Sequence, residues 1–220
     1  MSSESALRDG NRADFELIET MRWEPGSGFL RFERHLARLY ASAAELGFAC
    51  DPQRIGEVLK NAIGGQRIAL RTRLALQRNG EATAAAQPFE QLPAGRAWRL
   101  QLARVRLDSG NLLLRHKTSR RETYQQARAE YLATRADEVL LANERGELCE
   151  GTITNLFADF GDGMLVTPRL DCGLLPGVLR GELLDEGRAA EAIYTFDDLK
   201  SAQAIFVGNS LRGLIPARLA

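Results

Sequence analysis

The first half of the chain alternates between short apolar segments and helical stripes. We expect strands over residues 14–23 and 29–32, separated by a turn at Pro25-Gly26-Ser27-Gly28. Asp51 and Pro52 supply the N-cap and the first turn of a later helix. An earlier helix, which Gly47 ends, is predicted by apolar residues at helical spacing, namely Leu36, Leu39, Tyr40, Ala43 and Leu46.

A hairpin completes this first group of elements. Residues 66–77 mostly alternate between apolar and polar side chains, which predicts a strand. Asn79-Gly80 is a strong turn signal that leads into a further strand over 82–86. The pattern therefore predicts a small α+β lobe over residues 1–95 and a second lobe over 96–220.

The second half begins with an expected strand over 98–105 and a loop through Asp108-Ser109-Gly110. A helix is expected over 119–134, because Ser119 and Glu122 have the spacing of a capping box. Another helix is expected over 178–186, after a glycine-rich turn. The remaining apolar segments predict strands over 138–142, 152–160, 164–167, 191–195, 204–207 and 214–217.

Composition limits the kinds of partner. The 220 residues carry 29 basic and 29 acidic side chains, and a net charge of zero argues against nucleic acid as the main partner. Residues 1–14 are polar and lack the apolar core of a signal peptide, and no apolar run is long enough to cross a membrane. We therefore expect a cytoplasmic protein. Cys50, Cys149 and Cys172 lack metal or disulfide spacing and are expected to be buried free thiols.

Lys117 is the first candidate for chemistry. It lies between a predicted loop and a predicted helix, and four basic residues flank it, namely Arg115, His116, Arg120 and Arg121. Neighbouring positive charge favours the neutral amine that a nucleophilic lysine needs. On this segment alone, a solvated surface lysine at a basic helix start is the better interpretation.

The later motifs change that interpretation. Glu150-Gly151-Thr152-Ile153-Thr154-Asn155-Leu156-Phe157 is followed by Thr167-Pro168 and by Gly173-Leu174-Leu175-Pro176-Gly177-Val178-Leu179-Arg180. Their order and spacing resemble the signature of class IV aminotransferases, the fold-type IV pyridoxal-phosphate enzymes. His35-Leu36-Ala37-Arg38-Leu39 is similar to the family's early helix. The resemblance implies a two-lobed α+β fold like that of D-amino-acid aminotransferase, with a small N-terminal lobe and a larger C-terminal lobe with a mixed sheet or barrel.

The resemblance also assigns roles. Lys117 takes the place of the lysine that carries pyridoxal 5'-phosphate as a Schiff base, and Glu150 that of the carboxylate that keeps the ring nitrogen protonated. Arg38 is implied as a contact of the cofactor phosphate. Further cofactor contacts are implied at the backbone of Gly177, Val178 and Leu179, at Asn209 and Ser210, and at Thr154 and Asn155. Thr152, Thr154 and Asn155 have a structural alternative, which is to hold a tight strand entry.

The substrate is less firmly indicated. Residues 15–23 and Thr167-Pro168-Arg169-Leu170-Asp171 are most similar to 4-amino-4-deoxychorismate lyases, which release para-aminobenzoate and pyruvate in folate biosynthesis. Thr20 and Arg22 are then candidate substrate contacts, or else strand residues that face solvent. A branched-chain or D-amino-acid aminotransferase is the alternative, and a non-catalytic binding module derived from the family is a second one. The resemblance implies a homodimer, and an aminodeoxychorismate synthase would supply the substrate.

Overall fold

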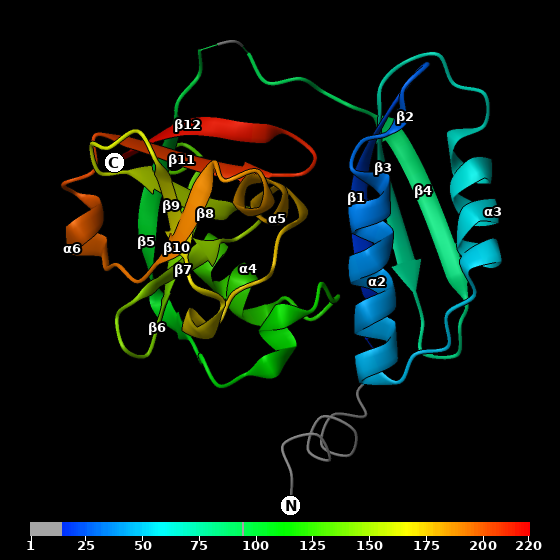
Figure 1. Cartoon of the computed structure of the whole chain (residues 1–220), viewed down its shortest axis with the longest axis horizontal. Coiled ribbons are helices and arrows are strands. Elements are labelled where there is room, and N and C mark those ends of the chain that lie inside the picture. Colours follow the sequence, from blue (N-terminus) through cyan, green and yellow to red (C-terminus); the bar gives the residue numbers. More distant parts are fainter. Residues whose placement is uncertain (1–14, 94) are drawn as a thin grey trace, which may run out of the picture. The chain divides into compact units, whose positions relative to one another are not determined.

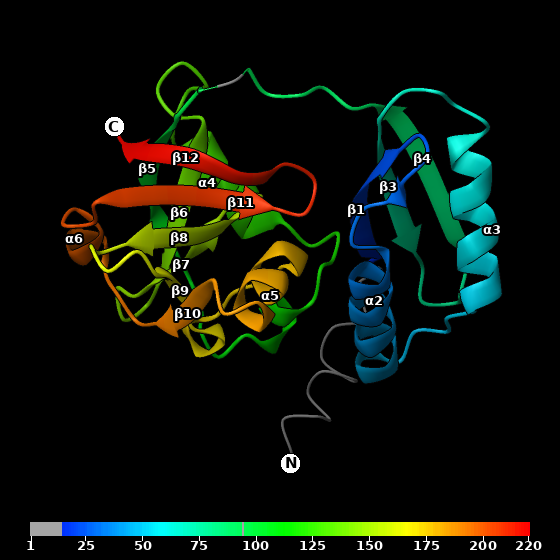
Figure 2. The same ribbon diagram turned by 45° about the horizontal axis from the view of Figure 1, so that its top comes forward.

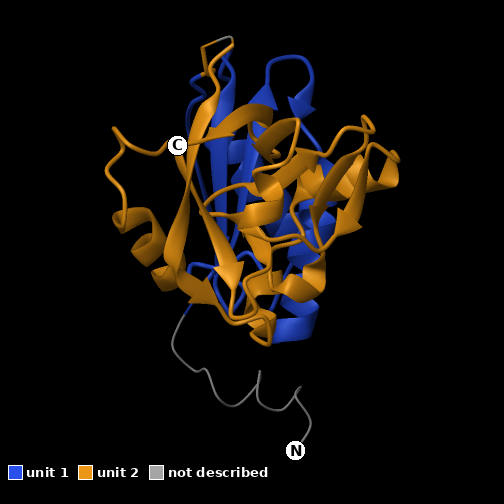
Figure 3. Ribbon diagram, turned by 90° about the vertical axis from the view of Figure 1, so that its left-hand side faces the viewer, with its two compact units in different colours: residues 1–90, 116–120 blue, residues 91–115, 121–220 orange. Residues whose placement is uncertain are grey.

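The computed structural model describes residues 15–93 and 95–220, which form two compact units (Figure 3). Unit 1 contains the described residues up to Glu90 together with His116–Arg120, and unit 2 contains the remainder. Segment 116–120, which includes Lys117, therefore packs with the first unit although it follows the start of the second. The polar segment 1–14 lies outside the described residues.

Unit 1 is a small antiparallel sheet with two helices, coloured blue to green in Figure 1. Its elements are β1 (Leu17–Glu24), β2 (Gly28–Phe29), α2 (Phe32–Leu46), α3 (Pro52–Ile63), β3 (Leu70–Leu76) and β4 (Ala82–Pro88). The strand order in the described part is β2-β1-β3-β4. Helix α2 packs on β1, and α3 packs mainly on β4.

The local signals of this unit act as the sequence predicts. The Asp51 carboxylate accepts a hydrogen bond from the Gln53 amide at 2.9 Å and caps α3. Gly47 ends α2 with a left-handed φ of 70°. Asn79 and Gly80 turn β3 into β4, and Gly80 has a φ of 91°.

One expected strand of unit 1 forms but is shorter than predicted. The expected strand over 29–32 is found as β2 at Gly28–Phe29, and α2 already begins at Phe32. Arg31, with a φ of 57°, turns the backbone into the helix.

Unit 2 is built on an eight-stranded mixed sheet (Figure 2). Its strands are β5 (Trp98–Leu107), β6 (Glu138–Asn143), β7 (Leu148–Gly151), β8 (Asn155–Asp159), β9 (Leu165–Pro168), β10 (Ala189–Ala192), β11 (Ala204–Asn209) and β12 (Gly213–Leu219). Its helices are α4 (Glu122–Ala129), α5 (Val178–Asp185) and α6 (Phe196–Leu199), with short 3₁₀ turns η1 (Leu112–Arg115) and η2 (Leu170–Cys172). Strand β7 also pairs with β8, so the ring β8-β11-β12-β5-β6-β7 closes into a barrel. The expected two-lobed α+β fold with a mixed sheet or barrel is confirmed.

Apolar side chains from all six ring strands fill the barrel. The fully buried members include Leu100, Leu140, Leu148, Leu156 and Val207. Helix α4 covers the outer side through Ala127, and α5 does so through Leu179 and Leu183. Cys149 and Cys172 are buried free thiols as expected, whereas Cys50 is half-buried.

The expected helix over 119–134 is shorter than predicted, and its capping box is wrong. Helix α4 runs only from Glu122 to Ala129, and its N-cap residue Arg121 makes no side-chain cap. The Ser119 hydroxyl instead accepts a hydrogen bond from the amide of Glu16 at 2.9 Å. Residues before α4 are therefore held as an extended segment by a partner more than a hundred positions earlier.

Among the described helices, none combines the length and the apolar character that a membrane span requires.

Candidate functional site

Lys117 lies on an extended segment that adds to the edge of β1. The Lys117 carbonyl accepts a hydrogen bond from the Ile18 amide at 2.8 Å, and Thr118 pairs with Leu17 as an isolated antiparallel bridge. On the helix side of this segment, the Nδ1 atom of His116 lies 2.9 Å from the Ser42 hydroxyl of α2. Backbone and histidine together fix the base of the Lys117 side chain.

Strand alternation places Lys117 on the side of the sheet opposite α2. Because residues directly opposite in an antiparallel pair share a face, Thr118 shares the face of Leu17, and Lys117 shares that of Ile18. The register of β1 with β3 adds further residues to this face, and we call Thr20, Arg22, Arg71 and Arg73 the open face of unit 1. Arg71 and Arg73 are exposed, and the Glu16 carboxylate lies 3.9 Å from Arg73, also on that side.

Arg22 is the half-buried arginine of the open face. Its guanidinium pairs with Glu24 and lies 4.3 Å from the centre of the Phe89 ring. Its Nε atom is buried and has no hydrogen-bond partner among the described residues. The arginine thus keeps one donor that a carboxylate ligand could satisfy.

Arg38 lies in a buried ion cluster on the helix side of β1. Its Nε donates to Glu19 Oε1 at 2.9 Å and its Nη2 donates to Oε2 at 2.7 Å, while His35 Nδ1 lies 2.6 Å from Oε2. Burial would raise the pKa of Glu19, but Arg38 and His35 outweigh it and lower that pKa from 4.5 to about 2. Glu19 therefore holds the Arg38 guanidinium in one orientation. The implied role of Arg38 toward a phosphate stays a prediction.

In unit 2, the carboxylate of Glu150 accepts hydrogen bonds from three neutral donors. The Tyr124 hydroxyl donates to Oε1 at 2.7 Å, the Leu175 amide donates to the same oxygen at 3.3 Å, and Asn155 Nδ2 donates to Oε2 at 3.4 Å. Donors at both oxygens favour the charged carboxylate. Glu150 is buried, and its bridge to Asn155 joins β7 to β8.

The loop between Glu150 and Asn155 is wrapped around a second buried carboxylate. Glu138 Oε1 accepts from the amide and the hydroxyl of Thr152, and Oε2 accepts from the Ile153 amide and the Thr154 hydroxyl. The expected strand over 152–160 therefore begins only at Asn155. The hydroxyls of Thr152 and Thr154 hold the strand entry, which is the structural alternative that the sequence left open.

The start of α5 has the features of an anion site. Gly177 is its N-cap and contributes no capping side chain, so the first-turn amides have no such partner. A Cβ at Gly177 would lie 1.8 Å from Asn155 Oδ1, so only glycine allows Asn155 to approach this turn. Leu179 is buried with Phe157 and Leu183, so its side chain belongs to the core, as expected for a backbone-only contact.

The C-terminal end of β11 lies beside α5. A Cβ at Gly208 would lie 2.8 Å from the Leu179 side chain, which shows how closely the two segments approach. Asn209 is used to shape its own turn, because its Oδ1 accepts from the amides of Leu211 and Arg212 and its Nδ2 donates to the Ile153 carbonyl. Ser210 is buried next to it.

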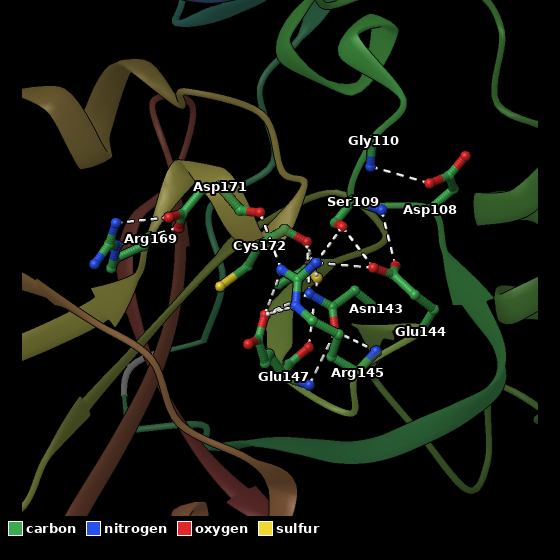
Figure 4. A network of polar contacts seen from close by, with 11 residues as sticks. Asp108, Ser109, Gly110, Asn143, Glu144, Arg145, Glu147, Arg169, Asp171 and Cys172 are labelled. Carbon is green, nitrogen blue, oxygen red and sulfur yellow. Dashed lines mark hydrogen bonds and ion pairs between the residues drawn. The ribbon is translucent and has the colours of Figure 1, made fainter.

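A polar network fixes the approach to the glycine-rich turn (Figure 4). Ser109 donates to Glu144 through its amide at 2.9 Å and its hydroxyl at 2.6 Å, and these bonds lower the pKa of Glu144 to about 2. Asn143 Nδ2 donates to the Cys172 carbonyl at 3.0 Å. Gly173 packs directly on this loop, since a Cβ there would lie 2.8 Å from Ser109 Cα. The segment from Gly173 onward thus leaves a rigid base.

The residues of each unit, taken separately, fit pyridoxal phosphate. In unit 2, the buried Glu150 carboxylate has donors at both oxygens and suits a protonated ring nitrogen, and the uncapped start of α5 suits a phosphate. In unit 1, the backbone of Lys117 is anchored on β1, and its amine suits a Schiff base. Sequence reasoning missed Tyr124, Glu138, Arg71 and Arg73. The alternation of Arg71 and Arg73 was the one readable signal among these, because residues two positions apart in a strand share a face.

Comparison with known proteins agrees with this fit. The profile of the family described as Amino-transferase class IV matches residues 16–220. A Schizosaccharomyces pombe protein named "Putative aminodeoxychorismate lyase" is 31% identical over 202 residues, which cover 89% of this chain and 86% of that protein.

Solved structures give the same family. A Mesorhizobium loti protein described as "Putative amino-acid aminotransferase" is 78% identical with a TM-score of 0.93, covering 94% of this chain and 100% of that one. The 4-amino-4-deoxychorismate lyase of Pseudomonas aeruginosa is 26% identical with a TM-score of 0.79, covering 93% of this chain and 82% of that one. The chain therefore belongs to the class IV aminotransferase family and is an enzyme that depends on pyridoxal phosphate.

Proposed function

We propose that this enzyme is a 4-amino-4-deoxychorismate lyase, which releases para-aminobenzoate and pyruvate in folate biosynthesis. The observation that carries the proposal is the open face of unit 1, where Arg22, Arg71 and Arg73 share the side of the sheet from which Lys117 projects. The names of the S. pombe and P. aeruginosa relatives support the same reaction.

The charge of the open face suits this substrate. Aminodeoxychorismate carries one carboxylate on its ring and another on its enolpyruvyl group, and guanidinium groups bind carboxylates through paired, charge-assisted hydrogen bonds. The aliphatic side chain of a branched-chain amino acid would gain little from contact with exposed arginines, because the favourable term for such a group is burial against apolar surface. The face thus favours an anionic substrate.

The chain's own residues then have distinct tasks. Pyridoxal phosphate supplies the electron sink, and Glu150 holds the proton on its ring nitrogen. With the cofactor bound, the Lys117 amine would act as the base that removes the proton from the substrate carbon that bears the amine. That electron pair completes the aromatic ring while the C–O bond to the neighbouring enolpyruvyl group breaks, and the leaving enolate takes a proton to become pyruvate. The atoms balance without a second substrate.

An aminotransferase is the competing proposal, because the M. loti relative carries that name. A transaminase must return the amino group to a keto acid, whereas the lyase needs no acceptor. The purified holoenzyme is incubated with aminodeoxychorismate without any keto acid, and pyruvate is followed with lactate dehydrogenase. Steady multiple-turnover release that is lost in Lys117→Ala supports the lyase. Amino transfer from an L- or D-amino acid without pyruvate release contradicts it.

Variants of the open face sharpen this test. Arg73→Gln should raise KM for aminodeoxychorismate by about 10-fold or more, as expected for one lost charge-assisted hydrogen bond, with a smaller effect on kcat. Arg67→Gln is the matched control, since Arg67 is exposed and lies outside the strands of the sheet. An equal KM in both variants would show that the open face does not bind the substrate.

We propose in addition that the enzyme acts as a homodimer supplied by an aminodeoxychorismate synthase.

A further inference from the structure

Tyr124 is a half-buried tyrosine that belongs to none of the sequence motifs described above. It lies in the first turn of α4, and its hydroxyl donates to Glu150 Oε1 at 2.7 Å. Burial and the adjacent Glu150 charge raise the pKa of Tyr124 well above its ordinary value, so the hydroxyl stays protonated and acts as a donor. This is the shortest of the three hydrogen bonds to Glu150 described above.

The surroundings hold the Tyr124 ring in place. The Arg121 guanidinium lies 4.6 Å from the ring centre, and the same side chain donates to the Thr152 carbonyl. The ring packs against the apolar cluster that includes Ala127 and Cys149. Because the ring is fixed on two sides, its hydroxyl fixes the position of the Glu150 carboxylate.

We infer that Tyr124 is a positioning residue that keeps Glu150 charged and correctly oriented toward the cofactor ring nitrogen. A hydrogen-bond donor lowers the proton affinity of a carboxylate, so the shared proton stays on the ring nitrogen instead of moving to Glu150. This inference rests on the role of Glu150 in the proposed function, and it holds equally for a lyase and for an aminotransferase.

The test compares two phenylalanine variants. Tyr124→Phe removes the hydroxyl that reaches Glu150. Tyr131→Phe removes a hydroxyl that donates to the Leu102 carbonyl at 2.8 Å, and Tyr131 is likewise half-buried against the same apolar cluster. Both variants lose one hydrogen bond and keep the ring, so they differ chiefly in whether that bond reaches Glu150.

The measurement is the visible absorption of the holoenzyme during acid titration, together with the affinity for added cofactor. Tyr124→Phe should bind the cofactor about 10-fold more weakly, and the pH at which half of it is lost should rise by about one unit. Tyr131→Phe should match the wild type. Equal behaviour of both variants would overturn the inference. If Glu150→Gln also leaves the titration unchanged, the role assigned to Glu150 fails instead.

Discussion

Acid should lower the free energy of unfolding of this protein by protonating Glu19, and the substitution Glu19→Gln should remove this part of the pH dependence. The Glu19 side chain is 1% exposed, and its pKa of about 2 in the folded protein compares with 4.5 as its ordinary value. A carboxylate with a lowered folded pKa stabilises the protein above its unfolded pKa, and this contribution is lost as the pH falls toward the folded pKa. The full difference corresponds to about 3 kcal/mol, of which about 2 kcal/mol is lost by pH 3.

Glu19→Gln removes both this pH dependence and the partner of Arg38. The Arg38 side chain is only 12% exposed, so the variant leaves a largely buried cation without its carboxylate. Removal of one partner of a buried pair typically costs about 3–5 kcal/mol. We expect a loss of this size at pH 7. The difference between wild type and variant should then shrink by about 2 kcal/mol toward pH 3.

Urea unfolding at a series of pH values from 7 to 3 measures this. Unfolding is followed by the fluorescence of Trp23 in β1 of unit 1 and of Trp98 in β5 of unit 2. Replacing one tryptophan at a time by Phe leaves a signal from one unit only. Glu57→Gln is the matched control, because Glu57 and Arg54 form an exposed pair in the same unit. Parallel curves for wild type and Glu19→Gln between pH 5 and 3, or a loss below about 1 kcal/mol at pH 7, would refute the argument.

Two further predictions concern the cofactor. Lys117→Ala should abolish turnover and leave no covalently bound cofactor after borohydride reduction, which peptide mapping checks; cofactor fixed instead on Lys60 or Lys200 would contradict this. Glu150→Gln should bind the cofactor more weakly and, when saturated with added cofactor, should turn over about 10²-fold or more slowly, because an amide cannot hold a proton on the ring nitrogen. An unchanged kcat would show that Glu150 is not its partner.

Local signals in the sequence predicted the turns and caps of unit 1 well. Asp51, Gly47 and Asn79-Gly80 act through bonds to near neighbours, so their chemistry is readable from a few residues. The Ser119 capping box failed for the opposite reason. The Ser119 hydroxyl instead accepts a hydrogen bond from the Glu16 amide. No local pattern in the sequence reveals a partner so far away along the chain.

In the candidate site, too, some residues could be identified from a local motif, whereas others required the tertiary structure. The motif identified Glu150 and Asn155, and the structure brings them together as a bridge between β7 and β8. The motif could not identify Glu138, because five donors converge on its carboxylate only after β6 pairs with the strands beside it. Arg71 and Arg73 needed the register of β3 against β1 before they could be assigned to the face of Lys117.

Two of the buried carboxylates, Glu19 and Glu150, are stabilised in different ways. Glu19 is paired with the Arg38 guanidinium, so its charge is largely cancelled and serves to hold a cation in place. Glu150 is held by a tyrosine hydroxyl, an amide side chain and a backbone amide, which are neutral. Each of these neutral donors stabilises an anion without cancelling its charge, which suits the role proposed for Glu150 toward a protonated ring nitrogen. Replacement of Tyr124 by a cationic residue should therefore harm cofactor binding more than its replacement by Phe, because the cation would compete for the same carboxylate.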